Sequence, residues 1–428
     1  MSLTYWIFAV VVLGFAIRVL STRFILLSTF ISRCSYYYSS EAPRPPSEDS
    51  LESAPRSNNI ASFAVLGNSN LKSRLMARAI PNKRLIETFG ISNALTTTSV
   101  GTYRRFMAKV RPTVKEIKPG KWLRFHEAAS TTLDLILAQS RGIRSVPLAI
   151  LTRQLVFVSI LNTFFDTNPS KVNFEEVTAA TNLINRIWVE SKAVPRPNLK
   201  EERRALEDAL KQILPDRYPW TAKENPLNII IPAYETMWRV VLLTFITVGF
   251  RSVDQETTDQ FREVIESVPE CLESGRSEDT ATTALNFAKE GLRLYPPTKR
   301  IYRSVPLPGT PLTKEMAADV EKCHRDPDIW VRPEEFRPER FHPDEFTKAM
   351  GDAYLPFSIP PHRCPAADNF APHAVIVLVV VLARGLGTVN TGSSVKFGDD
   401  KLDRDRSALL PAGRMDMEGW ELEMGNLV

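Results

Sequence analysis

Apolar residues recur at three- and four-residue spacing through most of the chain after about residue 60, the pattern of helices with one buried face. Strand signals are few and short, and the clearest covers 299–305. The pattern therefore predicts a mainly helical fold with small β-sheets, of the α+β class. The spacing predicts helices over 84–89, 102–110, 123–140, 148–165, 174–190, 199–214 and 280–294.

Two longer apolar runs, at 228–250 and from Phe370 through 375–382, predict buried core helices. The first could be a membrane span, but Glu235 and Arg239 would then lie near its centre, each costing about 2.5–3.5 kcal/mol. Pro232 predicts a local opening of this helix. The second run is too short to span a bilayer.

A further apolar run covers 3–17, and the basic residues Arg18, Arg23 and Arg33 all follow it. A signal peptide would instead carry its basic residue before the run, and remains the alternative. We expect an anchor of residues 1–34 with one transmembrane helix over about 3–20 and the body on the cytoplasmic side. The Pro- and Ser-rich stretch 35–60 predicts a linker, and 61–428 the globular domain.

Composition and charge are compatible with many classes of globular protein and exclude few of them. The 428 residues are 43% hydrophobic and 24% charged, which is ordinary globular composition. A net charge of +5 does not suggest nucleic acid, but it suits an acidic partner or an anionic membrane surface. Four cysteines with no disulfide-like spacing indicate a reducing compartment.

One of these cysteines, Cys364, closes a short, turn-prone, basic loop just before the run at Phe370. A helix N-terminus favours negative charge, and His362 and Arg363 add cationic character, so we expect a thiolate that can bind a soft metal. The alternative is an inert buried cysteine in an ordinary turn. A zinc site would use residues whose spacing fits no common zinc pattern: Cys323, His324, His342, His362 and Cys364.

Glu290 and Arg293 lie three residues apart on one face of the predicted helix 280–294. They form either a surface pair of little energetic weight or a buried pair that needs further partners. Three motifs then occur in one order: Glu290–Arg293, Pro338–Phe341 and Phe357–Cys364. This order resembles the haem-thiolate monooxygenases, the cytochromes P-450, from about residue 80 onward, in the style of fungal microsomal members.

The resemblance implies haem b held between a long central helix and the loop of Cys364, which would be the axial ligand of the iron. Thiolate ligation favours cleavage of the O–O bond. Glu290, Arg293 and Arg340 match a buried cluster that locks helix to loop behind the haem. Residues that would bind the haem propionates are Arg303, His362 and Arg104 or Arg105.

The segment 232–236 resembles the oxygen-binding part of the family's central helix. Ala233 is the small residue that leaves room for O₂, and Glu235 and Thr236 would form a proton relay. A helix opened at Pro232 would leave backbone groups free to hold water and oxygen. A hydroxyl of Thr236 bonded back to its own helix is the alternative.

The chain departs from the family pattern at three places. Pro360 stands where the loop usually has Gly, Ala366 replaces the commoner Gly after the ligand, and Val100–Gly101 replaces a tryptophan. Proline fixes φ where glycine would leave it free, so the first departure bears on the shape of the haem loop. The order of the motifs is unaffected by all three.

The implied reaction inserts one oxygen atom from O₂ into an apolar small molecule, with electrons from NADPH through a partner reductase. The fungal style suggests secondary-metabolite biosynthesis at the endoplasmic reticulum. Alternatives are a haem-thiolate isomerase or dehydratase, and a degenerate haem-free membrane protein.

Overall fold

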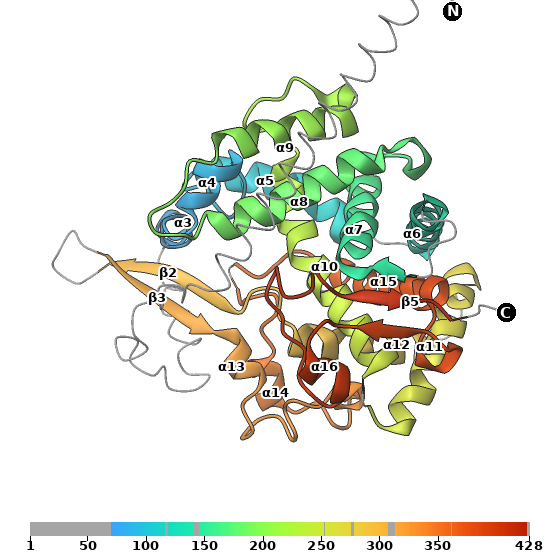
Figure 1. Cartoon of the computed structure of the whole chain (residues 1–428). Coiled ribbons are helices and arrows are strands. Elements are labelled where there is room, and N and C mark those ends of the chain that lie inside the picture. Colours follow the sequence, from blue (N-terminus) through green and yellow to red (C-terminus); the bar gives the residue numbers. More distant parts are fainter. Residues whose placement is uncertain are drawn as a thin grey trace, which may run out of the picture. The chain divides into compact units, whose positions relative to one another are not determined.

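The computed structural model describes residues 70–115, 119–139, 145–251, 253–274, 278–306, 313–360 and 362–425. All of them belong to one compact unit, Pro55–Val428. The expected membrane anchor and linker lie outside the described residues. Within those residues the fold is mainly helical with two small sheets, as the sequence pattern predicts (Figure 1).

Three apolar helices form the centre of the core: α7 (Leu148–Phe165), α10 (Leu227–Phe250) and α15 (Phe370–Leu386). Each is long and apolar enough to cross a membrane, so the expectation that the run from Phe370 is too short for this is wrong. Yet 78–83% of each apolar window is buried inside the fold. Helix α10 packs against both α7 and α15. A helix that is apolar on all sides suits such an interior place, so the prediction of buried core helices is confirmed.

The other α-helices surround this core, and α8 and α9 lie side by side as a pair (Figure 1). Those predicted at 148–165 and 174–190 have the predicted ends. The prediction omitted α11, although its buried residues Phe261, Val264 and Val268 carry the same spacing. The helices are α3 Leu71–Ala79, α4 Lys83–Phe89, α5 Val100–Lys115, α6 Pro119–Gln139, α8 Phe174–Glu190, α9 Lys200–Ile213, α11 Gln255–Ser274, α12 Glu278–Leu294, α13 Val320–His324, α14 Lys348–Ala353 and α16 Asp400–Arg404.

Two small antiparallel sheets complete the fold. In the first, β5 (Glu421–Glu423) lies between β1 (Ser145–Pro147) and β4 (Ser394–Lys396). In the second, β2 (Arg300–Pro306) pairs with β3 (Thr313–Asp319), so the strand predicted at 299–305 is present. Helix α3 packs against β2 (Figure 1). This contact brings the first described helix beside the strand that follows α12.

Candidate functional site

The loop that carries Cys364 leads into α15. The Cys364 N–H donates to the carbonyl of Phe357 at 2.9 Å, and the Ala367 N–H donates to the carbonyl of Cys364 at 3.2 Å. Ser358 takes the left-handed backbone conformation, with φ of 60°. The residue of this loop with left-handed φ is Ser358 and not Pro360, whose ring fixes a negative φ.

The surroundings of the thiol differ from the sequence-based expectation. Burial raises the pKa of Cys364, and the backbone N–H of Ala366 only partly opposes this. The charge of Arg363 is directed to Asp368, 2.6 Å away. Burial also lowers the pKa of His362 to about 3, so this ring is neutral at pH 7. The expected cationic help from His362 is therefore wrong, because this ring is neutral. The charge of Arg363, although paired with Asp368, does lower the pKa of Cys364, but less than burial raises it.

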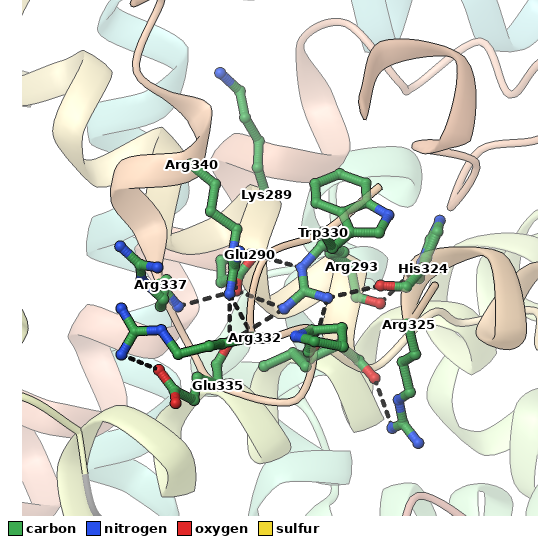
Figure 2. Close-up of polar contacts among 12 residues, drawn as sticks. Lys289, Glu290, Arg293, His324, Arg325, Trp330, Arg332, Glu335, Arg337 and Arg340 are labelled. Atoms are coloured by element: carbon green, nitrogen blue, oxygen red, sulfur yellow. Dashed lines mark hydrogen bonds and ion pairs between the residues drawn. The ribbon is translucent and has the colours of Figure 1, made fainter. Parts of the chain in front are cut away.

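Glu290, Arg293 and Arg340 meet in one buried network, the Glu–Arg–Arg cluster (Figure 2). Arg293 donates from Nε and Nη2 to the two carboxylate oxygens of Glu290, both at 2.7 Å. Arg340 Nε donates to Glu290 Oε1 at 3.3 Å. Their exposed fractions are 0%, 0% and 3%, so the cluster is sealed from water. A surface pair is therefore excluded.

Two guanidinium groups face one carboxylate here, and backbone carbonyls satisfy the remaining donors. Arg293 Nη1 donates to the carbonyls of His324 and Pro333, both at 2.7 Å, and Arg340 Nη2 to that of Arg332 at 2.7 Å. These bonds tie α12 to the segment between α13 and η5 (Pro338–Phe341) (Figure 2). They are the further partners that a buried ion pair requires.

His324 extends this network toward the cysteine loop. Its Nε2 accepts the backbone N–H of Leu355 at 2.8 Å, so the proton must sit on Nδ1, which donates to the carbonyl of Arg293 at 2.8 Å. Burial lowers the pKa of His324 to about 3, in keeping with this neutral ring. His324 thus joins the end of α12 to the chain that leads into the Cys364 loop.

Three arginine side chains lie near the imidazole of His362, two residues before Cys364. We call Arg74 and Arg78 of α3, Arg303 of β2 and His362 the cationic group. Arg78 and Arg303 are 7% and 8% exposed. Burial lowers the pKa of both to about 10, and for Arg78 the charge of Arg303 contributes. His362 Nε2 hydrogen-bonds to the carbonyl of Arg74 at 3.2 Å.

The cationic group has no carboxylate partner among the described residues. Arg78 donates to the carbonyl of Ala94, and its guanidinium lies 5.8 Å from the ring of Tyr103. Two buried donors of the group lack any partner within the described ranges: Arg74 Nε and Arg78 Nε. His362 Nδ1 also lacks a partner there, but it is an acceptor, because the neutral ring donates from Nε2 to the carbonyl of Arg74. Buried positive charge with unused donors fits an anionic ligand that accepts several hydrogen bonds.

The sequence predicts Arg303 and His362 at such a site but misses Arg78. Helix α3 lies before the stretch with recognisable motifs, and only its packing against β2 brings Arg78 near Arg303. The other predicted residues, Arg104 and Arg105, are exposed, and Arg105 donates to Thr102 Oγ1 at 3.3 Å. Tyr103, between Arg78 and this pair, is the α5 residue that contacts the group. Binding by Arg104 or Arg105 stays a prediction.

Helix α10 runs through Pro232 without an assigned break. Proline has no N–H, so the carbonyl of Asn228 loses its helical donor. Asn93 replaces it, donating from Nδ2 to that carbonyl at 2.9 Å. The expectation of free backbone groups at Pro232 is therefore wrong for this carbonyl, because a side chain from another segment satisfies it.

Glu235 and Thr236 do not bond to each other. Thr236 Oγ1 donates to the carbonyl of Pro232 at 2.8 Å, the back-bonded alternative. Glu235 is 1% exposed and is paired with Arg414 of the C-terminal segment, while its Oε2 has no partner among the described residues. Ala233 is partly buried beside the same core. A relay through Glu235 and Thr236 would need one of these side chains to change partner.

Comparisons with known proteins agree with this geometry. The family model for cytochrome P-450 matches residues 284–373, which include Glu290, Arg293, Arg340 and Cys364. No curated protein matches the chain in sequence.

Solved structures with the same fold include a 6-coordinated cytochrome P-450 from Thermus thermophilus, with 17% identity and a TM-score of 0.51. That match covers 77% of this chain and 91% of the other. The haem domain of cytochrome P-450DA matches at 14% identity and a TM-score of 0.55, over 76% of this chain and 78% of that one. A mutant of that haem domain matches at 13% identity and a TM-score of 0.57, over 80% of each chain.

The chain therefore has the fold of the cytochromes P-450, and its segment 284–373 matches the model of that family.

The described residues fit the haem that a cytochrome P-450 fold implies. Cys364 would provide a partly buried sulfur as ligand for the iron. The cationic group, with the unused donors of Arg74 and Arg78, would provide partners for the two haem carboxylates. Within the described residues, no group of three or more His, Cys, Asp or Glu side chains could hold a separate metal ion.

Proposed function

We propose that this protein is a haem-thiolate monooxygenase that inserts one oxygen atom from O₂ into a largely apolar small molecule. The observation that carries the proposal is the sealed Glu–Arg–Arg cluster, joined through His324 to the Cys364 loop, with the carboxylate-free cationic group beside it. Such a cluster keeps a loop rigid, and the cationic group suits an anionic cofactor.

The residues take separate roles in this proposal. Cys364 binds the iron, and Arg78, Arg303 and His362 bind the haem carboxylates. The bound haem supplies the activation of O₂. Thr236 holds or moves a proton at its hydroxyl, which now donates to the carbonyl of Pro232. Electrons come from NADPH through a partner reductase, and the exposed Lys109 and Arg111 of α5 suit an acidic docking surface.

The test is the spectrum of the purified protein, reduced and exposed to carbon monoxide. A strongly red-shifted Soret band is expected, and Cys364→Ala should abolish it. Cys271→Ala is the matched control, because Cys271 lies in α11 away from the motif, and it should keep the band. Absence of haem absorbance from the native protein would rule out both the monooxygenase and the isomerase or dehydratase. The remaining hypothesis would then be a haem-free membrane protein.

A second candidate is a haem-thiolate isomerase or dehydratase that acts on a peroxide. The back-bonded Thr236 and the Glu235–Arg414 pair favour it, since such an enzyme does without a proton relay. Thr236→Ala separates the two. A monooxygenase should keep the carbon monoxide band but release peroxide instead of product. An isomerase should convert an organic hydroperoxide without NADPH, with the variant as active as the native protein.

We also propose a cellular location for the reaction. The apolar run at 3–17 with following basic residues supports an anchor in the endoplasmic reticulum and a cytoplasmic catalytic body. Secondary-metabolite biosynthesis rests only on the resemblance to fungal microsomal members.

A further inference from the structure

A second positively charged site lies at the C-terminal end of α8, where three segments meet around Trp188. The guanidinium of Arg84, from α4, lies 4.8 Å from the centre of the Trp188 ring. That of Arg414, from the C-terminal segment, lies 4.5 Å from it. Lys192 follows α8 directly. We call Arg84, Trp188, Lys192 and Arg414 the tryptophan cluster.

The positive charge of the tryptophan cluster is only partly balanced by the protein. Arg414 is paired with Glu235, whereas Arg84 and Lys192 form no ion pair among the described residues. Arg84 Nη1 donates to Ser191 Oγ, a neutral acceptor, at 2.7 Å. Like charges held this close repel each other unless an anion joins them.

The titration behaviour of these groups agrees with an excess of positive charge. Burial, then Arg414 and Arg196, lower the pKa of Arg84 to about 10. The side chain of Lys192 is exposed overall, but partial burial of its ammonium and the charges of Arg414 and Arg84 lower its pKa to about 8. Lys192 remains mostly protonated at pH 7 and is accessible to a ligand from solvent.

The cluster also holds a donor without an acceptor. The Nε1–H of Trp188 is buried and has no partner among the described residues. An indole N–H can only donate, so it calls for an oxygen acceptor. Carboxylate oxygens accept from both indole and guanidinium donors, and an arginine can bind a carboxylate with two parallel hydrogen bonds.

Contacts along α10 connect the cluster to the proposed reaction site. Glu235, the partner of Arg414, precedes Thr236 on α10. Arg239, one turn further on, donates to the carbonyls of Ala412 at 2.9 Å and Pro297 at 3.0 Å. The segment that carries Arg414 is therefore fixed to the part of α10 that contains Ala233 and Thr236.

We propose that the tryptophan cluster binds the carboxylate of an otherwise apolar substrate, whose carbon skeleton extends from there toward the haem. This proposal rests on the proposed monooxygenase function, because the bound acid is a substrate only if the protein oxidises it. It replaces a purely apolar substrate by an acid with an apolar body. Binding can be measured without turnover, so the two proposals fail separately.

The experiment compares 4-phenylbutanoate with 4-phenylbutan-1-ol, which share a skeleton and differ in charge. Binding of each to the full-length protein is measured by calorimetry at pH 7, and the carbon monoxide band of the same sample reports haem. We expect the acid to bind about tenfold more tightly than the alcohol. Arg84→Gln and Lys192→Gln should each weaken the acid about fivefold and leave the alcohol unchanged.

Lys211→Gln is the matched control, because Lys211 also lies over an aromatic ring, 4.5 Å from that of Tyr218, outside the cluster. It should leave both affinities unchanged. Equal affinities for acid and alcohol, no acid binding by protein that shows the band, or equal losses for both compounds would each overturn the proposal. A missing band with preferential acid binding would instead overturn the monooxygenase function and keep this site.

Discussion

Among single residues, Gly291 marks a close approach between α12 and α10. A Cβ added there would lie 2.0 Å from Thr244 Oγ1 and 3.1 Å from Thr244 Cβ. Thr244 is fully buried, so it has little room to move. The absence of a side chain at Gly291 lets the helix that carries Glu290 and Arg293 approach the central helix.

We therefore expect Gly291→Ala to lower the free energy of unfolding by about 1–3 kcal/mol, as other overpacked cores do. Chemical denaturation measures this change. Gly120→Ala is the control, since nothing lies within 4 Å of a Cβ at that position, and it should be neutral or slightly stabilising. Adding Thr244→Ala should restore part of the stability of Gly291→Ala, and no restoration would contradict the clash.

His324 predicts a pH dependence of stability. Its pKa is about 3 in the folded protein and 6.5 for an ordinary histidine, so the unfolded chain binds more protons between these values. Stability should then fall as the pH is lowered from about 6.5 toward 3, by at most about 1.4 kcal/mol per pH unit from this group.

His324→Gln removes the titrating group and can still donate and accept hydrogen bonds. Unfolding free energies of both proteins, measured by denaturant at several pH values, should differ most near neutral pH and converge on acidification. Parallel curves for the two proteins would show that His324 is not held neutral.

At the scale of elements, the Glu–Arg–Arg cluster fixes α12 to the segment before the cysteine loop. Arg293→Lys keeps the charge but loses the two parallel bonds to Glu290 and the bonds to backbone carbonyls. We expect a loss of about 3–5 kcal/mol in unfolding free energy, the cost of breaking a buried pair, together with loss of haem.

The control is Arg404→Lys in α16, whose partner Asp400 is also on the surface. Their side chains are 81% and 93% exposed, and the change should cost under about 0.5 kcal/mol. Denaturation curves and haem content of both variants test the prediction. Similar losses for Arg293→Lys and Arg404→Lys would mean that burial of the cluster contributes nothing.

At the scale of the whole molecule, the body and the N-terminal segment are predicted to have separate roles. Removal of residues 1–34 should release the protein from the membrane fraction, because the apolar run at 3–17 is lost. The carbon monoxide band should persist, since every residue assigned to the haem lies at 74 or beyond. Fractionation and spectra of both forms measure this, and a truncated protein that stays with the membrane would contradict the anchor.

The sequence alone predicted much of the helical fold, because apolar spacing reports the buried face of a helix directly. The residues alone left a surface pair or a buried pair of Glu290 and Arg293 open, and the buried cluster with Arg340 followed from the family resemblance of the motifs and their order. It could not predict Arg78, whose role depends on packing between α3 and β2. Nor could it predict that Arg363 turns to Asp368, because a side chain's partner depends on local geometry.

What the sequence determined by itself is the helical class, the core helices and the order of the motifs that ends at Cys364. These follow from local periodicity and residue type. The partners of the buried polar groups depend on the tertiary structure. Glu235 pairs with Arg414, the carbonyl of Asn228 accepts a hydrogen bond from Asn93, and Arg78 lies near Arg303. The physical reason is that a buried polar group must find its partner among whatever segments the fold brings near, however distant in the chain.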